Sequence, residues 1–155
     1  MKNIEFELSE KGLKYLEELE DVRLEAYKDD AGVLTIGIGS TEGVNKGDII
    51  TMDEVYQRFK KDSKWVLKCL ENVNIPNLNQ NQFDALFFLI FNIGAPRFIS
   101  STVLKKIREK ANRKDIENAW QMWNKIRNPK TNQLVISKGL NNRRKKEINY
   151  YFTPL

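Results

Sequence analysis

The sequence predicts a mainly helical α+β protein with two lobes, and two observations carry this prediction. Most apolar side chains recur at the three- and four-residue spacing of amphipathic helices. Residues 22–40 instead combine β-branched and aromatic residues around a D-D-A-G turn, which is typical of a hairpin or small meander. We therefore expect one domain over residues 1–155, with a small sheet-bearing lobe over about 20–50.

Two helices flank the predicted hairpin. Ser9 can cap the first, over residues 9–20. Thr51 or Asp53 can open the second, which we expect to run as one connecting helix over about 53–72, because apolar residues recur there at helical spacing. The predicted order is therefore a helix, a small sheet and a long helix before the second lobe begins.

The helical lobe is expected over about 79–155, together with the first helix. Asn79 and Gln82 resemble a capping box. They open a central helix, 80–93, which is apolar on nearly every side and should be buried. The later segments are expected to be helices near 100–111 and 114–126, a loop or weak hairpin over 127–139, and a helix over about 140–152 with the basic residues 143–146 outside. A small lobe that faces this lobe would create a cleft, where ligand sites are preferred.

Histidine is absent from the sequence, and this excludes several kinds of catalysis. Hydrolases that use Ser-His-Asp or Cys-His groups cannot be built from this chain, and a catalytic zinc site is disfavoured. Carboxylates, lysine or tyrosine must therefore carry any acid–base chemistry, and we expect neither a cofactor nor a metal. The single cysteine, Cys69, is expected to be a buried thiol on a helix.

The net charge of +5 favours polyanionic partners, namely nucleic acid, anionic lipid or anionic wall polymers. The basic run at 143–146 is interpreted first as a solvated helix face, and second as an electrostatic patch for wall polymers or lipid. No recognition motif supports a nucleic-acid partner, and a monomer is favoured. The N-terminus lacks the apolar stretch of a signal peptide, and the apolar run 85–93 is too short to cross a bilayer. We therefore expect a soluble product whose export needs outside help.

Three oxygen-bearing side chains could together serve the cleavage of a glycosidic bond. Glu20 should lie at a helix end, Asp29 in the hairpin turn and Thr35 on the returning strand. Glycosidic cleavage needs two carboxyl groups in different protonation states. We expect Glu20 to be the protonated acid, with its pKa raised by partial burial, and Asp29 to stay ionised in a wetter turn. The Thr35 hydroxyl could then position a water beside Asp29.

The stretch around these residues resembles the signature of phage-type lysozymes, glycoside hydrolase family 24. The family pattern is a Glu, an R-L pair, a Tyr, an Asp and T-I-G-x-G. It stands here as Glu20, Arg23-Leu24, Tyr27, Asp29 and Thr35-Ile36-Gly37-Ile38-Gly39, with the spacing Glu-x8-Asp-x5-Thr. The segments 85–94, 101–104 and 139–147 resemble later blocks of the family, so the resemblance covers about residues 9–152.

The resemblance implies a two-lobed, lysozyme-like fold and an endolysin-type muramidase. Such an enzyme hydrolyses the β-1,4 bond between N-acetylmuramic acid and N-acetylglucosamine in bacterial peptidoglycan. Glu20 is the implied proton donor, and Asp29 with Thr35 would place or activate water. Three further positions align loosely with sugar-contacting residues of the family: Phe91, Asn92 and Ser101. A member of the family would wait in the host cytoplasm until a membrane pore lets it reach the cell wall.

Two departures from the family pattern leave alternatives open. Asp21 stands where Gly is common, so it could raise the pKa of Glu20 or disturb the helix end. Ser40 stands where His is common, so a structural ion pair of the family would be absent. The alternatives are a glycan-binding module that does not cut, a lytic transglycosylase, which needs only one acid, and a basic nucleic-acid-binding domain.

Overall fold

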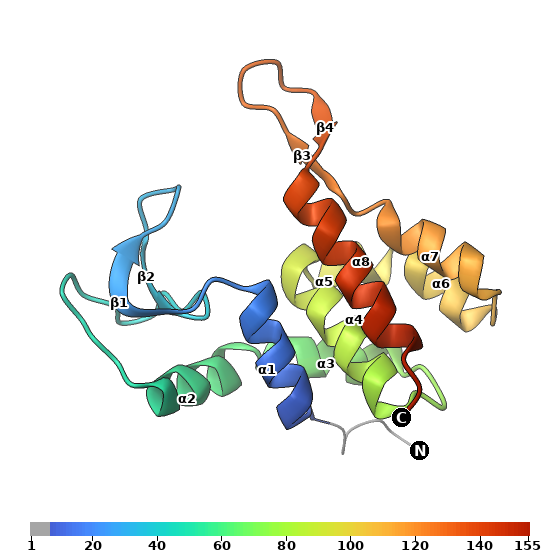
Figure 1. Ribbon diagram of the computed structural model, residues 1–155, viewed down its shortest axis with the longest axis horizontal. Helices are drawn as coiled ribbons and strands as arrows, with labels where there is room; N and C mark the ends of the chain where they lie inside the picture. Colours follow the sequence, from blue (N-terminus) through green and yellow to red (C-terminus); the bar gives the residue numbers. More distant parts are fainter. Residues whose placement is uncertain (1–6) are drawn as a thin grey trace. The chain divides into compact units, whose positions relative to one another are not determined.

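The computed structural model describes residues 7–155, which divide into two compact units (Figure 1). The β1–β2 unit comprises Leu13–Trp65, and the helical unit comprises the described residues up to Gly12 together with Val66–Leu155. Residues 1–6, where the predicted absence of a signal peptide partly falls, lie outside the described residues. Within the described part, helices dominate and the strands form two antiparallel pairs, which confirms the mainly helical α+β class.

The elements follow the chain in this order: α1 (Glu10–Leu19), β1 (Arg23–Lys28), β2 (Leu34–Gly37), α2 (Met52–Asp62), α3 (Lys64–Val73), α4 (Gln80–Ile93), α5 (Ala95–Ile99), α6 (Thr102–Arg108), α7 (Arg113–Gln121), β3 (Lys125–Arg127), β4 (Leu134–Ile136) and α8 (Lys138–Phe152). The predicted first and central helices are thus found almost residue for residue, and the weak hairpin near 127–139 is present as β3 and β4. No helix of the described residues is both long and apolar enough to cross a bilayer.

The β1–β2 unit contains the predicted small meander. Strands β1 and β2 pair antiparallel, with Tyr27 opposite Thr35. The segment 48–50 runs along the other edge of β1, where the Ala26 N–H donates to the Asp48 carbonyl at 2.9 Å. Helix α2 packs against β2. The small sheet is therefore backed by a helix of its own unit.

The predicted single helix over 53–72 is wrong, because the chain forms two helices, α2 and α3, that separate at Ser63. Thr51 caps α2 as expected and forms a capping box with Glu54. Ser63 is buried, and its backbone at φ −99° and ψ 8° leaves the helical region. Apolar spacing continues through this residue, so periodicity could not reveal the break. The weak helix propensity of serine is the local signal for it.

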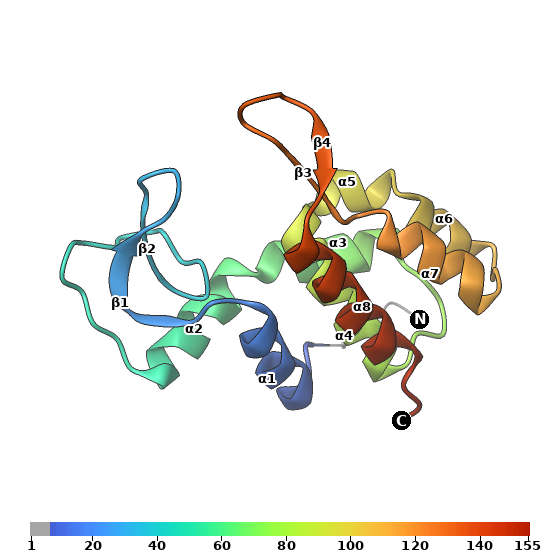
Figure 2. The ribbon, with the colours of Figure 1, turned by 45° about the horizontal axis from the view of Figure 1, so that its top comes forward.

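The core of the helical unit is built on α4. Asn79 and Gln82 form the predicted capping box at its start, and α8 lies alongside it in both views (Figures 1 and 2). The buried side chains of α4 include Phe83, Leu86, Phe87, Phe88, Leu89 and Ile90. Cys69 on α3 is also buried, as expected, and this burial raises the pKa of its thiol.

A buried carboxylate, Asp84, joins the start of α1 to α4 and α8 within the helical unit. It accepts hydrogen bonds from the Ser9 N–H at 3.1 Å, the Ser9 hydroxyl, the Gln80 amide at 2.8 Å and the Tyr150 hydroxyl at 2.7 Å. The Ser9 hydroxyl also accepts from the Gly12 N–H at 2.9 Å, so Ser9 caps α1 as expected. A Cβ at Gly12 would lie 2.7 Å from the Asp84 carboxylate, so this approach requires glycine.

Candidate functional site

Asp29 starts the turn between β1 and β2. Its N–H donates to the Val33 carbonyl at 2.9 Å, and its Oδ1 accepts from the N–H groups of Ala31 at 2.9 Å and Val33 at 2.8 Å. Gly32 takes the left-handed conformation, with φ +80°, that lets the turn close. Both bonds to the side chain end on Oδ1, so they leave Oδ2 available to another donor.

Thr35 is joined to Asp29 through the backbone of Val33. The Thr35 hydroxyl donates to the Val33 carbonyl at 2.9 Å, and the same carbonyl accepts from the Asp29 N–H. Because Tyr27 lies opposite Thr35, Asp29 lies opposite Val33 and diagonal to Thr35 on one face of the hairpin. The hydroxyl oxygen of Thr35 keeps a lone pair that can accept a hydrogen bond from water. The structure therefore brings these two predicted site residues together.

Glu20 is the first residue after α1 and is half-buried. Its N–H donates to the Leu16 carbonyl at 2.8 Å, so the last helical turn is intact beside Asp21. The Asp21 carboxylate accepts from Arg23 Nε at 2.9 Å, and both side chains are exposed. Asp21 therefore does not disturb the end of α1. Its negative charge is paired with the Arg23 guanidinium.

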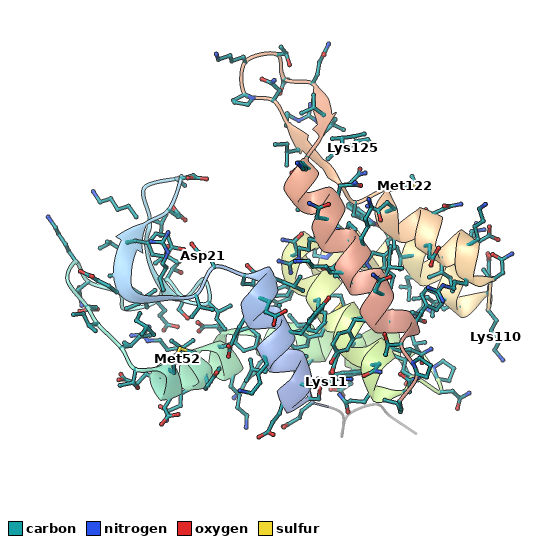
Figure 3. The ribbon with its side chains drawn as sticks, in the orientation of Figure 1. Lys11, Asp21, Met52, Lys110, Met122 and Lys125 are labelled. Carbon is teal, nitrogen blue, oxygen red and sulfur yellow. The ribbon has the colours of Figure 1, made fainter. Side chains whose placement is uncertain are left out.

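A series of contacts leads from this helix end to the hairpin. Asp21, labelled in Figure 3 where the chain leaves α1, is paired with Arg23. The Arg23 guanidinium lies 4.7 Å from the centre of the Tyr27 ring, and Tyr27 is the strand partner of Thr35. The residue next to Glu20 is thus tied to the strand pair that carries Asp29 and Thr35. Arg23 and Tyr27 belong to the sequence motif, but their spacing in the motif does not reveal this contact with each other.

Ser40 replaces the missing histidine with a different contact. It is buried, and its hydroxyl donates to Asp62 Oδ2 at 2.5 Å. Its backbone also forms a two-way bridge with Ile36 on β2, at 2.9 Å in each direction. A hydrogen bond from a neutral group to a carboxylate therefore stands in place of the ion pair that the resemblance implies.

Replacing Ser40 with alanine should lower the free energy of unfolding by about 1–3 kcal/mol, because the Asp62 carboxylate loses a charge-assisted hydrogen bond. Urea denaturation checks this, with Thr41→Ala at the exposed neighbouring position as the matched control. An unchanged midpoint in the Ser40→Ala protein would show that the hydroxyl contributes nothing.

Two of the predicted sugar contacts, Phe91 and Ser101, are held by contacts within the helical unit. The Phe91 ring stacks on Phe87, with 6.4 Å between ring centres. Ser101 caps α6: its hydroxyl donates to the Phe98 carbonyl at 2.6 Å and accepts from the Leu104 N–H at 3.1 Å. Packing accounts for the position of Phe91, and capping accounts for that of Ser101. The contact of both residues with sugar stays a prediction.

The third predicted contact, Asn92, is exposed and lines a cavity of about 700 Å³ in the helical unit. Its side-chain oxygen accepts a hydrogen bond from Arg144. The cavity lies between the end of α4, the start of α8 and the β3–β4 hairpin, and among the described residues its lining holds four cations and no carboxylate. The lining residues are Asn92, Ile93, Arg97, Met122, Trp123, Lys125, Ile126, Arg127, Leu134, Leu140 and Arg144.

The prediction that the whole basic run 143–146 lies outside is wrong for its first two residues. Arg143 and Arg144 are buried against Glu147, which is also fully buried. Arg143 Nε donates to Glu147 Oε2 at 3.0 Å, and Arg144 Nη1 donates to Glu147 Oε1 at 2.7 Å. The Trp120 indole N–H donates to the same Oε1 at 3.0 Å. The three- and four-residue spacing to a single glutamate was the signal that the sequence offered.

Comparison with known proteins places these features in a family. Residues 17–147 match the Phage lysozyme family. The endolysin of Salmonella phage P22 is 38% identical over 124 residues, 77% of this chain and 84% of that protein. The SAR-endolysin of Pseudomonas phage phiKMV is 38% identical over 137 residues, 88% of this chain and 82% of that protein.

A solved structure gives the same result. The endolysin from Escherichia coli O157:H7 phage FAHEc1 superposes with a TM-score of 0.87 and 33% identity, over 96% of this chain and 94% of that one. The fold is therefore the lysozyme-like α+β fold that the sequence predicts. The family match spans most of the described residues and includes the stretch from Glu20 to Thr35. The chain belongs to the phage lysozyme family and is a glycoside hydrolase.

Proposed function

We propose that this chain is an endolysin-type muramidase that hydrolyses the β-1,4 bond between N-acetylmuramic acid and N-acetylglucosamine in bacterial peptidoglycan. The observation that carries the proposal is the pair of hydrogen bonds through which Asp29 and Thr35 share the backbone of Val33. The contact series from Asp21 to Tyr27 supports a place for Glu20 beside this pair. A carboxylic acid and a carboxylate are the two groups that this hydrolysis needs, and a hydroxyl can help to hold the water.

Each of the three residues has its own part in the reaction. Glu20 donates its proton to the glycosidic oxygen as the bond from that oxygen to the anomeric carbon breaks. A water held between Asp29 Oδ2 and the Thr35 hydroxyl adds to the anomeric carbon and gives its proton to Asp29. The two N–H groups on Oδ1 keep the Asp29 carboxylate in one orientation. The Thr35 hydroxyl, which donates to Val33, accepts from this water.

Asp29→Asn and Thr35→Ala should each lower kcat/KM on peptidoglycan by about 10³-fold, because each removes one of the two groups that hold water. Loss of turbidity of a permeabilised bacterial suspension measures the rate. Asp30→Asn is the matched control, because Asp30 is the exposed neighbour in the same turn and should keep the native rate. Rates close to native in both variants would move the chemistry to other residues.

Mass spectrometry of digested peptidoglycan tests the proposed reaction itself. Hydrolysis predicts new reducing ends that are absent from a digest with the Glu20→Gln protein. Anhydro ends would instead identify a lytic transglycosylase. Binding to the glycan without either product would identify a module that does not cut. Both of these outcomes would overturn the muramidase proposal.

The setting of the reaction is part of the same proposal. The protein is made in the host cytoplasm and acts on the cell wall after release through a membrane pore. It works as a monomer, without a nucleic-acid partner, and Phe91, Asn92 and Ser101 contact the sugar strand. The exposed end of the basic run, Lys145 and Lys146, supports an electrostatic contact with anionic wall polymers or lipid.

A further inference from the structure

The β3–β4 hairpin projects away from the helices of its own unit in both ribbon views (Figures 1 and 2). The strands are short and pair Lys125 with Ile136 and Arg127 with Leu134. Every residue of both strands is exposed. Leu134 and Ile136 leave 58% and 66% of their surface in solvent. Aliphatic side chains are seldom left so open together on a structure of this size unless something covers them.

The charge of the same region has a single sign. Residues 118–146 contain eight basic residues and no acidic residue. The buried pair Arg143 and Arg144 faces Glu147, but the other six basic residues are exposed. They are Lys125, Arg127, Lys130, Lys138, Lys145 and Lys146. Three of them lie on the hairpin itself, beside the exposed aliphatic side chains, and Figure 3 labels Lys125 at its base.

Internal hydrogen bonds keep the hairpin in shape. The Asn128 N–H donates to the Gln133 carbonyl at 2.8 Å, and the Asn132 N–H donates to the Asn128 carbonyl at 2.7 Å. Arg127 Nη1 donates to the Asn132 carbonyl at 2.6 Å, so its stem is fixed along the loop. A hairpin whose backbone groups are paired internally can enter a poorly hydrated layer at a lower cost than an open loop.

We propose that the β3–β4 hairpin docks the protein on an anionic phospholipid bilayer. The side chains of Leu134 and Ile136, which share one face of the strand pair, enter the boundary between headgroups and acyl chains, and Lys125, Arg127 and Lys130 contact lipid phosphates. Aliphatic and cationic side chains in one exposed strand pair suit such a surface, because burial of apolar area and charge attraction add there. The proposed catalytic residues all lie in the β1–β2 unit and the hairpin lies in the helical unit, where Lys125, Arg127 and Leu134 line the same cavity as Asn92.

Flotation with lipid vesicles tests the docking. The probes are vesicles of phosphatidylglycerol and phosphatidylcholine in about equal parts, and vesicles of phosphatidylcholine alone. We expect binding to the anionic vesicles that weakens with added salt and is at least about tenfold weaker on phosphatidylcholine. Equal binding to both vesicles, or to neither, would overturn the proposal.

Two pairs of variants distinguish the contribution of the hairpin to vesicle binding from the effects of net charge and of exposed aliphatic side chains. The triple change Lys125→Gln, Arg127→Gln and Lys130→Gln should weaken binding at least about tenfold. Its control, Lys60→Gln, Lys61→Gln and Lys114→Gln, removes the same charge from exposed sites elsewhere. Leu134→Ser with Ile136→Ser should also weaken binding, whereas Ile49→Ser with Ile99→Ser, at exposed sites, should not.

The outcomes are distinct for each cause. Equal loss in the hairpin triple and in its control would mean that net charge alone drives binding, and would overturn the proposal. Native vesicle binding in the hairpin variants would also overturn the proposal. So would hairpin variants that still bind vesicles but no longer bind isolated peptidoglycan. Circular dichroism of each variant verifies that the fold is retained. Because vesicles contain no glycan, failure here leaves the proposed muramidase activity unaffected.

Discussion

Glu20→Gln should lower the rate of peptidoglycan cleavage by about 10⁴-fold, the upper end of what general acid catalysis contributes. Glutamine has nearly the same shape as glutamate but carries no acidic proton, so the leaving oxygen would depart without protonation. Because the amide has nearly the shape of the carboxyl group, we expect the packing around this half-buried position to persist. Turbidity loss gives the rate, and thermal unfolding should show that the fold persists.

Glu18→Gln is the control for this variant, because Glu18 is an exposed glutamate at the same end of α1. It should keep the native rate, since it lies outside the proposed site. Full activity in the Glu20→Gln protein would remove Glu20 from the mechanism, whereas equal losses in both proteins would point to the charge of the helix end.

Glu147→Ala should give the largest loss of stability, a decrease of about 3–5 kcal/mol in the free energy of unfolding. The change would remove the carboxylate that two buried guanidinium groups, Arg143 and Arg144, share and that accepts from the Trp120 N–H. Removing one partner of a buried ion pair is strongly destabilising, because the remaining charge stays buried away from water. Chemical denaturation measures the difference.

Glu109→Ala is the matched control for a glutamate that is paired at the surface. Its contacts with Lys105 at 4.0 Å and Lys106 at 3.6 Å are half exposed, so its loss should cost at most about 1 kcal/mol. If the two variants lose similar stability, the buried cluster contributes no more to stability than a surface pair.

Much of the fold was accessible from the sequence because its signals are local. The capping boxes at Thr51 and Asn79 and the D-D-A-G turn each depend on a few neighbouring residues. The break at Ser63 was missed because the apolar spacing of α2 continues into α3. The burial of Arg143 and Arg144 was missed because a basic run suggests an exposed face, while their burial depends on Trp120 and the Phe88 carbonyl far away in the chain.

The sequence names the residues of the candidate site but does not show how they are connected. The spacing of Glu20, Asp29 and Thr35 is a property of the sequence, whereas the shared contacts with Val33 depend on the closed turn. The effect of Asp21 was also undecided, because its partner depends on how the chain leaves α1. Arg23, two residues later, turned out to be that partner.

The division of the helical unit has a consequence for how the chain folds during synthesis. Its residues up to Gly12 are separated from the rest by the whole continuous stretch Leu13–Trp65. Asp84 binds Ser9 on one side and Tyr150 on α8 on the other, so this network joins residues that are far apart in the order of synthesis. On the ribosome, the continuous stretch can form while later residues are still being translated. The nascent helical unit must wait for its final helix to emerge from the exit tunnel.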